Sequence, residues 1–284
     1  MKPFLGIDLT ENKKNEQING DEFLVCKPSA AMEDAYNRSS DQAEETVEKS
    51  ELPLPFRIVQ GVCGYGALLI FVGIIRSFAG EDGVTLAQAY ENAAWLFWLG
   101  GVMVLVWGAL KITAVRKEKS VLETEESTYI INKLEGVCDA IYAELSVPPQ
   151  AVEVDVLSFF YKEKDGNVKV VEKGMQLAPY MNPVFKLFAD EENIYLANLD
   201  GKYAFARASV VKLRTVKKTI SIAEWNKDEA YNKGIYKPYK IVEDQYGCIH
   251  CKNYHILEID HQGQSVGIYI PDYELPAWEA VLMK

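Results

Sequence analysis

The segment CIHCKNYHILEIDH gathers the side chains of this protein that most readily bind a metal or react. It contains all three histidines of the 284-residue chain, His250, His255 and His261, together with Cys248 and Cys251. Thiolate and imidazole are the usual ligands of zinc, and a Cys-x-x-Cys pair can hold one metal ion. The segment therefore makes Cys248, His250, Cys251 and His255 candidate ligands of a zinc site.

The backbone expected around these residues favours a structural role for them. The segment has the composition of a β-strand, in which alternate residues face opposite sides of the sheet. Cys248 and His250 would then share one face, whereas Cys251, His255 and His261 would share the other. Redox chemistry of a Cys-x-x-Cys pair generally uses a helix N-terminus to lower the thiol pKa, and none is evident. We expect half-buried strand residues and no cofactor, with a zinc-binding or redox-sensing module as the alternative.

Basic side chains gather just upstream, although the chain as a whole is acidic. The net charge is −11, which argues against nucleic-acid binding because phosphates require a positive field. Residues 201–223 nevertheless contain no acidic side chain. The candidates for contact with anionic lipids of the inner leaflet are Lys212, Arg214, Lys217 and Lys218. A solvated face, or pairing with the acidic N-terminal segment, is the alternative.

Aromatic side chains in WNKDEAYNKGIYKPYK form a third candidate site. Trp225, Tyr231 and Tyr236 lie in a stretch with turn-like composition. Because Trp and Tyr are enriched at protein interfaces, they could form a partner surface; packing over a sheet is the alternative. The sequence has no phosphate-binding loop and no nucleophile elbow. We therefore expect a protein that is not an enzyme, and we identify no small-molecule substrate; an enzyme whose site is assembled in the mouth of a β-barrel is the alternative.

Two long apolar segments are expected to hold these residues at a membrane. IVQGVCGYGALLIFVGII follows Arg57, AAWLFWLGGVMVLVWGAL precedes Lys111, and neither carries a charge. A helix of about 20 apolar residues crosses the ~30 Å hydrocarbon layer of a bilayer. We predict spans at 58–78 and 93–113, within a helical hairpin of residues 57–115.

Lysine and arginine predict the orientation of this hairpin. The connection at 77–92 contains neither residue, whereas the outer flanks carry Lys49, Arg57, Lys111, Arg116, Lys117 and Lys119. Short flanks rich in Lys and Arg stay in the cytoplasm. We therefore predict a two-span protein of the cell membrane with both termini cytoplasmic. The chain shows no secretory signal pattern, and its five scattered cysteines do not suggest a disulfide framework.

Three further segments are expected in the cytoplasm. Residues 1–27 have strand character, and because a strand must pair, we expect them to dock on the C-terminal domain. Residues 28–56 have the polar, acidic composition of a linker. Residues 118–147 carry apolar side chains at helical spacing and precede Pro148-Pro149, which predicts an amphipathic helix.

The apolar period changes to two from Ala151 onward, which predicts an antiparallel β meander over 151–284. Turn pairs such as Asp165-Gly166 and Asp200-Gly201 separate the strands, and ELPAWEAVLMK forms a final helix. This order, with the stretches NIYLANLDGKYAFARASVVKL and GIYIPDYELPAWEAVL, resembles the bacterial pleckstrin-homology-like membrane proteins.

The resemblance implies a membrane-anchored α+β fold. In this fold a two-helix transmembrane hairpin carries a cytoplasmic, partly open β-barrel that is closed by a C-terminal helix. The family uses this barrel for binding or assembly rather than for chemistry. We accordingly expect a non-catalytic interaction or scaffold protein, whose partners are the lipid bilayer and either another protein or further copies of itself.

Overall fold

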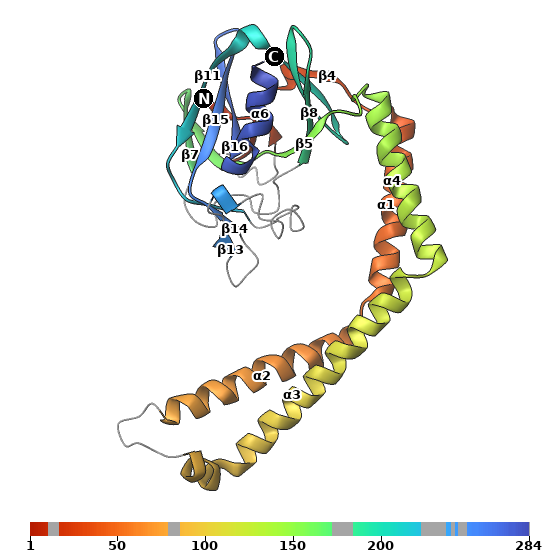
Figure 1. Ribbon diagram of the computed structural model, residues 1–284, viewed down its shortest axis with the longest axis vertical. Helices are drawn as coiled ribbons and strands as arrows, with labels where there is room; N and C mark the ends of the chain where they lie inside the picture. Colours follow the sequence, from red (N-terminus) through yellow and green to blue (C-terminus); the bar gives the residue numbers. More distant parts are fainter. Residues whose placement is uncertain are drawn as a thin grey trace. The chain divides into compact units, whose positions relative to one another are not determined.

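The computed structural model describes residues 1–10, 17–78, 86–171, 184–222, 237–239, 242–243 and 249–283. The chain is α+β and divides into two compact units (Figure 1). We call the unit formed by Met1–Met32 and Cys138–Lys284 the β domain, and the unit Glu33–Val137 the helical unit. In the sequence, the helical unit is inserted between two parts of the β domain.

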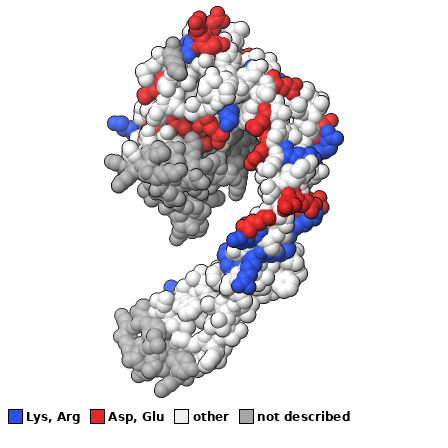
Figure 2. Space-filling view, turned by 45° about the vertical axis from the view of Figure 1, so that its right-hand side comes forward, with Lys and Arg blue, Asp and Glu red and all other residues white. Residues whose placement is uncertain are grey.

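The helical unit contains two helices that are long and apolar enough to cross a membrane. They are α2 (Leu54–Phe78) and α3 (Leu86–Leu122), with candidate spans over Leu54–Arg76 and Ala94–Leu122. Only 6% of each apolar window is buried, whereas the core helix of a soluble domain would be mostly buried. The described apolar part of this hairpin is almost free of charged side chains on the face shown in Figure 2.

Small residues allow α2 and α3 to approach each other. A Cβ atom on Gly64 would lie 2.9 Å from the Trp107 ring, and one on Gly66 would collide with Met103. On the other helix, a Cβ atom on Gly100 would lie 3.2 Å from Ile70. Glycines at these positions let the two backbones pack closely, as is common between helices in membranes.

The second apolar helix does not end where the charged residues begin. α3 continues to Leu122, and α4 (Glu125–Glu144) starts after a cap in which Thr124 Oγ1 accepts a hydrogen bond from the Ser127 N–H at 3.1 Å. The expectation of a separate helix over 118–147 is therefore wrong at its start. Residues 111–122 contain neither Gly nor Pro, so nothing in their sequence interrupts the helix.

The segment expected to be an acidic linker, with partial helix as one possibility, is helical over most of its length. α1 (Ala30–Ser50) buries only small polar side chains, Ser39, Thr46 and Ser50. Within the helical unit, Lys133 Nζ of α4 donates a hydrogen bond to Gln42 Oε1 of α1 at 3.0 Å. Alanine, glutamate and glutamine are good helix formers, and a helix that packs through small side chains needs few large apolar ones.

The β domain is built around two sheets (Figure 1). The first sheet contains, in spatial order, β4 (Leu24–Cys26), β10 (Gly201–Ala206), β9 (Asn193–Asn198), β8 (Val184–Ala189) and β5 (Val152–Asp155). The second contains β1 (Lys2–Pro3), β16 (Gln264–Pro271), β15 (Tyr254–His261) and β11 (Val210–Val216). Side chains from both sheets meet in one apolar core.

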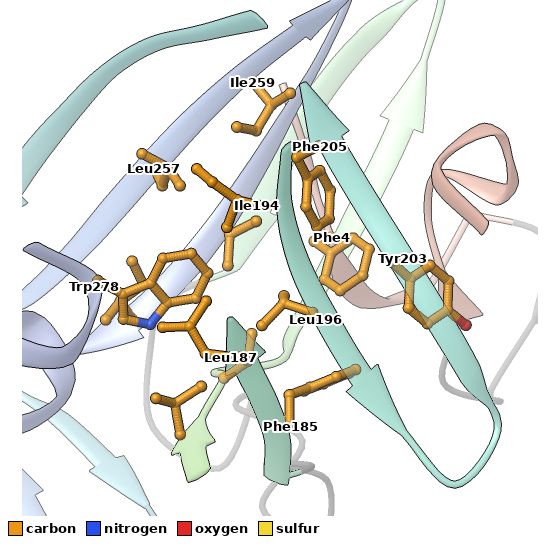
Figure 3. Packing of buried hydrophobic residues seen from close by; sticks show 14 of the residues in the cluster. Phe4, Phe185, Leu187, Ile194, Leu196, Tyr203, Phe205, Leu257, Ile259 and Trp278 are labelled. Atoms are coloured by element: carbon orange, nitrogen blue, oxygen red, sulfur yellow. The ribbon is translucent and has the colours of Figure 1, made fainter. Parts of the chain in front are cut away.

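Two smaller sheets complete the described strands. One has the order β3 (Gln17–Ile18), β2 (Leu5–Asp8), β6 (Phe159–Lys164) and β7 (Asn167–Val171). The other has the order β12 (Ile220–Ile222), β14 (Ile249–Cys251) and β13 (Val242–Glu243). Helix α6 (Leu275–Leu282) adds the fully buried Trp278 to the main core, where its ring lies beside Leu187 (Figure 3).

The N-terminal segment is part of the β domain. β1 pairs in parallel with β16, β2 pairs in parallel with β6, and β4 pairs antiparallel with β10. Phe4 is fully buried, with its ring centroid 5.3 Å from those of Tyr203 and Phe205 (Figure 3). Strands from both sides of the helical unit therefore share one core.

This packing predicts that replacing Phe4 destabilises the β domain, although most of that domain lies more than a hundred residues further along the chain. Phe4→Ala should lower the free energy of unfolding of the β domain by ~3–5 kcal/mol, because it removes a large buried ring and leaves a cavity. The measurement is the denaturant dependence of amide exchange in β15 and β16. Val25→Ala is the control, since Val25 is 56% exposed and its truncation should cost less than about 0.5 kcal/mol. Equal stability of the two variants would contradict the shared core.

Candidate functional site

The structure describes three of the four candidate metal ligands and does not arrange those three as a metal site. Cys248 lies outside the described residues, His250 and Cys251 are in β14, and His255 is in β15. Among the residues that are described, no group of three or more His, Cys, Asp or Glu side chains is arranged to hold a metal ion. A zinc site here remains a sequence-based alternative that no feature of the described residues supports.

Cys251 is buried in a second apolar cluster and is held as a neutral thiol. It is fully buried, in a cluster that includes Phe159, Tyr254 and Ile256. Burial, and then the negative charges of Asp272 and Asp155, raises the pKa of the Cys251 thiol to about 12. Because the thiolate is the form that binds metals and reacts, this environment opposes both zinc binding and redox chemistry.

His255 uses both of its ring nitrogens within the protein. Its Nε2 lies 2.7 Å from Asp272 Oδ1, and its Nδ1 lies 3.1 Å from Thr215 Oγ1. Thr215 on β11 is the cross-strand partner of His255 on β15, and directly opposite residues share one face of a sheet. With both nitrogens engaged, the ring has no free lone pair for a metal. The contacts instead tie β11 and β15 to the turn that begins with Asp272.

A second buried polar network lies where the chain enters α6. In the 3-10 turn Asp272–Glu274, Tyr273 Oη donates a hydrogen bond to Asp155 Oδ2 at 2.8 Å, and Glu274 Oε1 accepts one from the Asp155 N–H at 2.9 Å. Burial, and then the charge of Asp155, raises the pKa of Tyr273 well above its usual value, so the phenol remains a donor. The sequence gives no local signal of this network, because its members lie more than a hundred residues apart in the chain.

The four basic candidates lie on and just after an outer strand. Lys212 and Arg214 are in β11, Lys217 and Lys218 follow it, and all four are exposed. Lys212 Nζ lies 3.4 Å from Glu258 Oε2 on β15. Arg214 and Lys217 have no ion-pair partner among the described residues. Two positive charges in an acidic protein are therefore available to bind something else.

The aromatic candidates Trp225, Tyr231 and Tyr236 lie outside the described residues. Their role as a partner surface remains a prediction.

The apolar hairpin carries a groove whose lining contains no reactive group. The groove has a volume of about 410 Å³ and is lined by Gly64, Ala67, Leu68, Phe71, Val104 and Trp107. None of these side chains titrates, and a proton or ion pathway through a membrane needs ionisable or polar groups. The groove thus presents an apolar surface suited to lipid or to another helix.

Comparisons of the chain with known protein families, with curated proteins and with solved structures give no match. The function must therefore be inferred from the arrangement of the residues themselves.

The buried state of Cys251 predicts that alkylation will distinguish it from the other cysteines. At pH 8, a thiol with a pKa of about 12 is ionised in about one molecule in 10,000. Treatment of the native protein with iodoacetamide should modify the partly exposed Cys26 and leave Cys251 unmodified until urea is added. Peptide mass spectrometry measures both sites in one sample. Modification of Cys251 at the rate of Cys26 would show an accessible thiolate and revive the redox alternative.

Proposed function

We propose that this protein is a non-catalytic, membrane-anchored interaction protein. In this proposal, α2 and α3 cross the cell membrane, both termini lie in the cytoplasm, and the β domain is presented there to a protein partner. One observation carries the proposal: the strands before the two apolar helices pair with strands that follow them. Both ends of the apolar hairpin must then lie on the same side of the membrane, which an even number of spans allows.

The flanking charges support the cytoplasm as that side. Lys117 and Lys119 lie on α3 beyond its apolar stretch, and Arg57 lies near the start of α2. Lys117 Nζ donates a hydrogen bond to the carbonyl oxygen of Glu51, and Arg57 forms an ion pair with the carboxylate of Glu51. The basic ends of the two helices therefore both contact Glu51. Basic residues at both ends of the hairpin are what the positive-inside rule expects when the hairpin starts and ends in the cytoplasm.

The topology of the β domain supports a pleckstrin-homology-like fold for this module. β5, β8, β9 and β10 form successive antiparallel pairs, and so do β11, β15 and β16. α6 follows β16 and packs against the core that these strands form. This order of antiparallel strands and a C-terminal helix supports the resemblance to the bacterial pleckstrin-homology-like membrane proteins, whereas β6 and β7, which were expected in the same meander, lie in a separate sheet where β6 pairs in parallel with β2.

The burial and internal hydrogen bonds of the potentially reactive side chains favour a binding function over a catalytic one. Cys251 is a buried thiol, and both ring nitrogens of His255 are used in internal contacts. Tyr273 and Glu274 are bonded to Asp155. Each of these groups stabilises the domain, whereas the unpaired charges of Arg214 and Lys217 face outward. The surface of the domain is therefore its functional part in this proposal.

The topology predicts where engineered cysteines can be labelled in intact cells. Ser77→Cys, near the end of α2, should react with a membrane-impermeant maleimide, whereas Ser120→Cys, on the exposed end of α3, should react only after the cells are opened. The reverse pattern, or equal labelling of both positions, would refute the proposed orientation. Crosslinking followed by mass spectrometry in the native host would then identify the neighbours of the β domain.

A further inference from the structure

The strand β11 forms an open edge of the second sheet. Among the described strands it pairs with β15 alone, and it stands at the end of the sheet order. It is the longest of the described strands at the end of a sheet, and most of its residues are exposed. An exposed edge presents backbone N–H and C=O groups to which another extended segment can pair.

The pairing of β11 with β15 shows which of its side chains share a face. Lys212 is opposite Glu258 and Arg214 is opposite Ile256, so the two basic side chains project from one face of the sheet. Leu213 is opposite Leu257, and it projects from the other face, next to the main core. A strand added along β11 would therefore meet positive charge on one face and apolar surface on the other.

The charge on this edge selects against some occupants and for others. A second copy of β11 placed along the edge would bring Lys and Arg close to Lys and Arg, and like charges on neighbouring strands are destabilising. An acidic strand would instead offer a carboxylate to Arg214, which has no ion-pair partner among the described residues and shares its face with Lys212. The same charges thus discourage self-association and favour an acidic segment.

Side-chain contacts within the β domain also fix the position of β11 in the absence of a partner. Thr215 contacts His255 at 3.1 Å, and His255 contacts Asp272 at 2.7 Å. This chain of contacts connects β11 to its neighbour and to the turn before α6. A preformed edge loses little conformational entropy when a partner binds, which strengthens binding.

We infer that the edge of β11 is a docking site for an extended acidic segment of a partner protein, which pairs with β11 as an additional strand. The segment carries acidic residues at alternate positions, facing Lys212 and Arg214, and an apolar residue between them, facing Leu213. Val211 lies at the register shift between Val210 and Lys212, which marks the start of the regular edge. This inference rests on the proposed role of the β domain as an interaction module, and it specifies the partner's chemistry.

The test uses the full-length protein in nanodiscs of zwitterionic lipid and a seven-residue peptide of alternating valine and glutamate, blocked at both ends. Calorimetry should show saturable binding. Two further peptides carry N-methyl groups, one on the valines and one on the glutamates. Because only one edge of an added strand faces β11, one methylated peptide should lose binding and the other should keep it. The inference is overturned if none of the three peptides binds, or if all three bind equally.

A charge exchange separates specific docking from loss of the fold. Arg214→Glu should weaken binding of the valine–glutamate peptide by about tenfold and should strengthen binding of a valine–lysine peptide. Lys164→Glu, which changes an exposed lysine on β6, is the matched control and should leave both affinities unchanged. A loss of glutamate-peptide binding without a gain for the lysine peptide, or an equal effect of the control, would count against the site.

Vesicles test the competing occupant of this surface. Nanodiscs carrying the wild-type protein are mixed with vesicles that contain phosphatidylserine. If the vesicles bind through Arg214 while the valine–glutamate peptide does not bind, the surface recognises lipid and the strand-docking inference is wrong. If the vesicles neither bind nor compete with the peptide, the inference stands. Either result is independent of the labelling of Ser77→Cys and Ser120→Cys, which tests the proposed topology.

Discussion

Backbone pairing between the two ends of the chain is the constraint on which the rest of the structure depends. β1 completes one edge of the sheet that contains β16, and β4 completes one edge of the sheet that contains β10. Phe4 fills the space between them. Unpaired backbone groups and an exposed phenylalanine would each be costly, so the N-terminal segment is bound to the β domain. The helical unit is consequently an insertion into a fold, and the entropy of closing such an insertion grows only slowly with its length.

β15 explains why a segment rich in cysteine and histidine is structural. Leu257 and Ile259 of this strand belong to the main core, whereas Tyr254 and Ile256 belong to the second apolar cluster. A strand that is buried on both faces can retain a polar side chain only if that side chain is fully hydrogen-bonded. His255 meets this condition through Thr215 and Asp272. Its partners add rigidity to the sheet, which is a mechanical contribution rather than a chemical one.

The features that the sequence predicts well are those encoded locally. Both apolar helices lie where the uncharged runs predict them. Most of the described strands after residue 151 lie in segments where apolar and polar residues alternate. The features that it predicts poorly depend on distant partners. Nothing local to Asp155 indicates that Tyr273 and Glu274 will contact it, and nothing local to α1 indicates that its serines will be buried. Edge strands belong to the same class, because whether a strand such as β11 has a neighbour on each side is a property of the whole sheet.

The unbroken length of α3 has a consequence for how the protein can vary. Its 37 residues form a helix about 55 Å long, in which each residue is rotated by about 100° about the helix axis from the residue before it. The apolar stretch and the charged end are parts of this one helix, so neither can rotate without the other. The insertion of one residue between Trp107 and Lys117 would rotate Lys117 away from Glu51 and shift it along the helix axis by about 1.5 Å. The number of residues between Trp107 and Lys117 therefore determines whether Lys117 can reach Glu51.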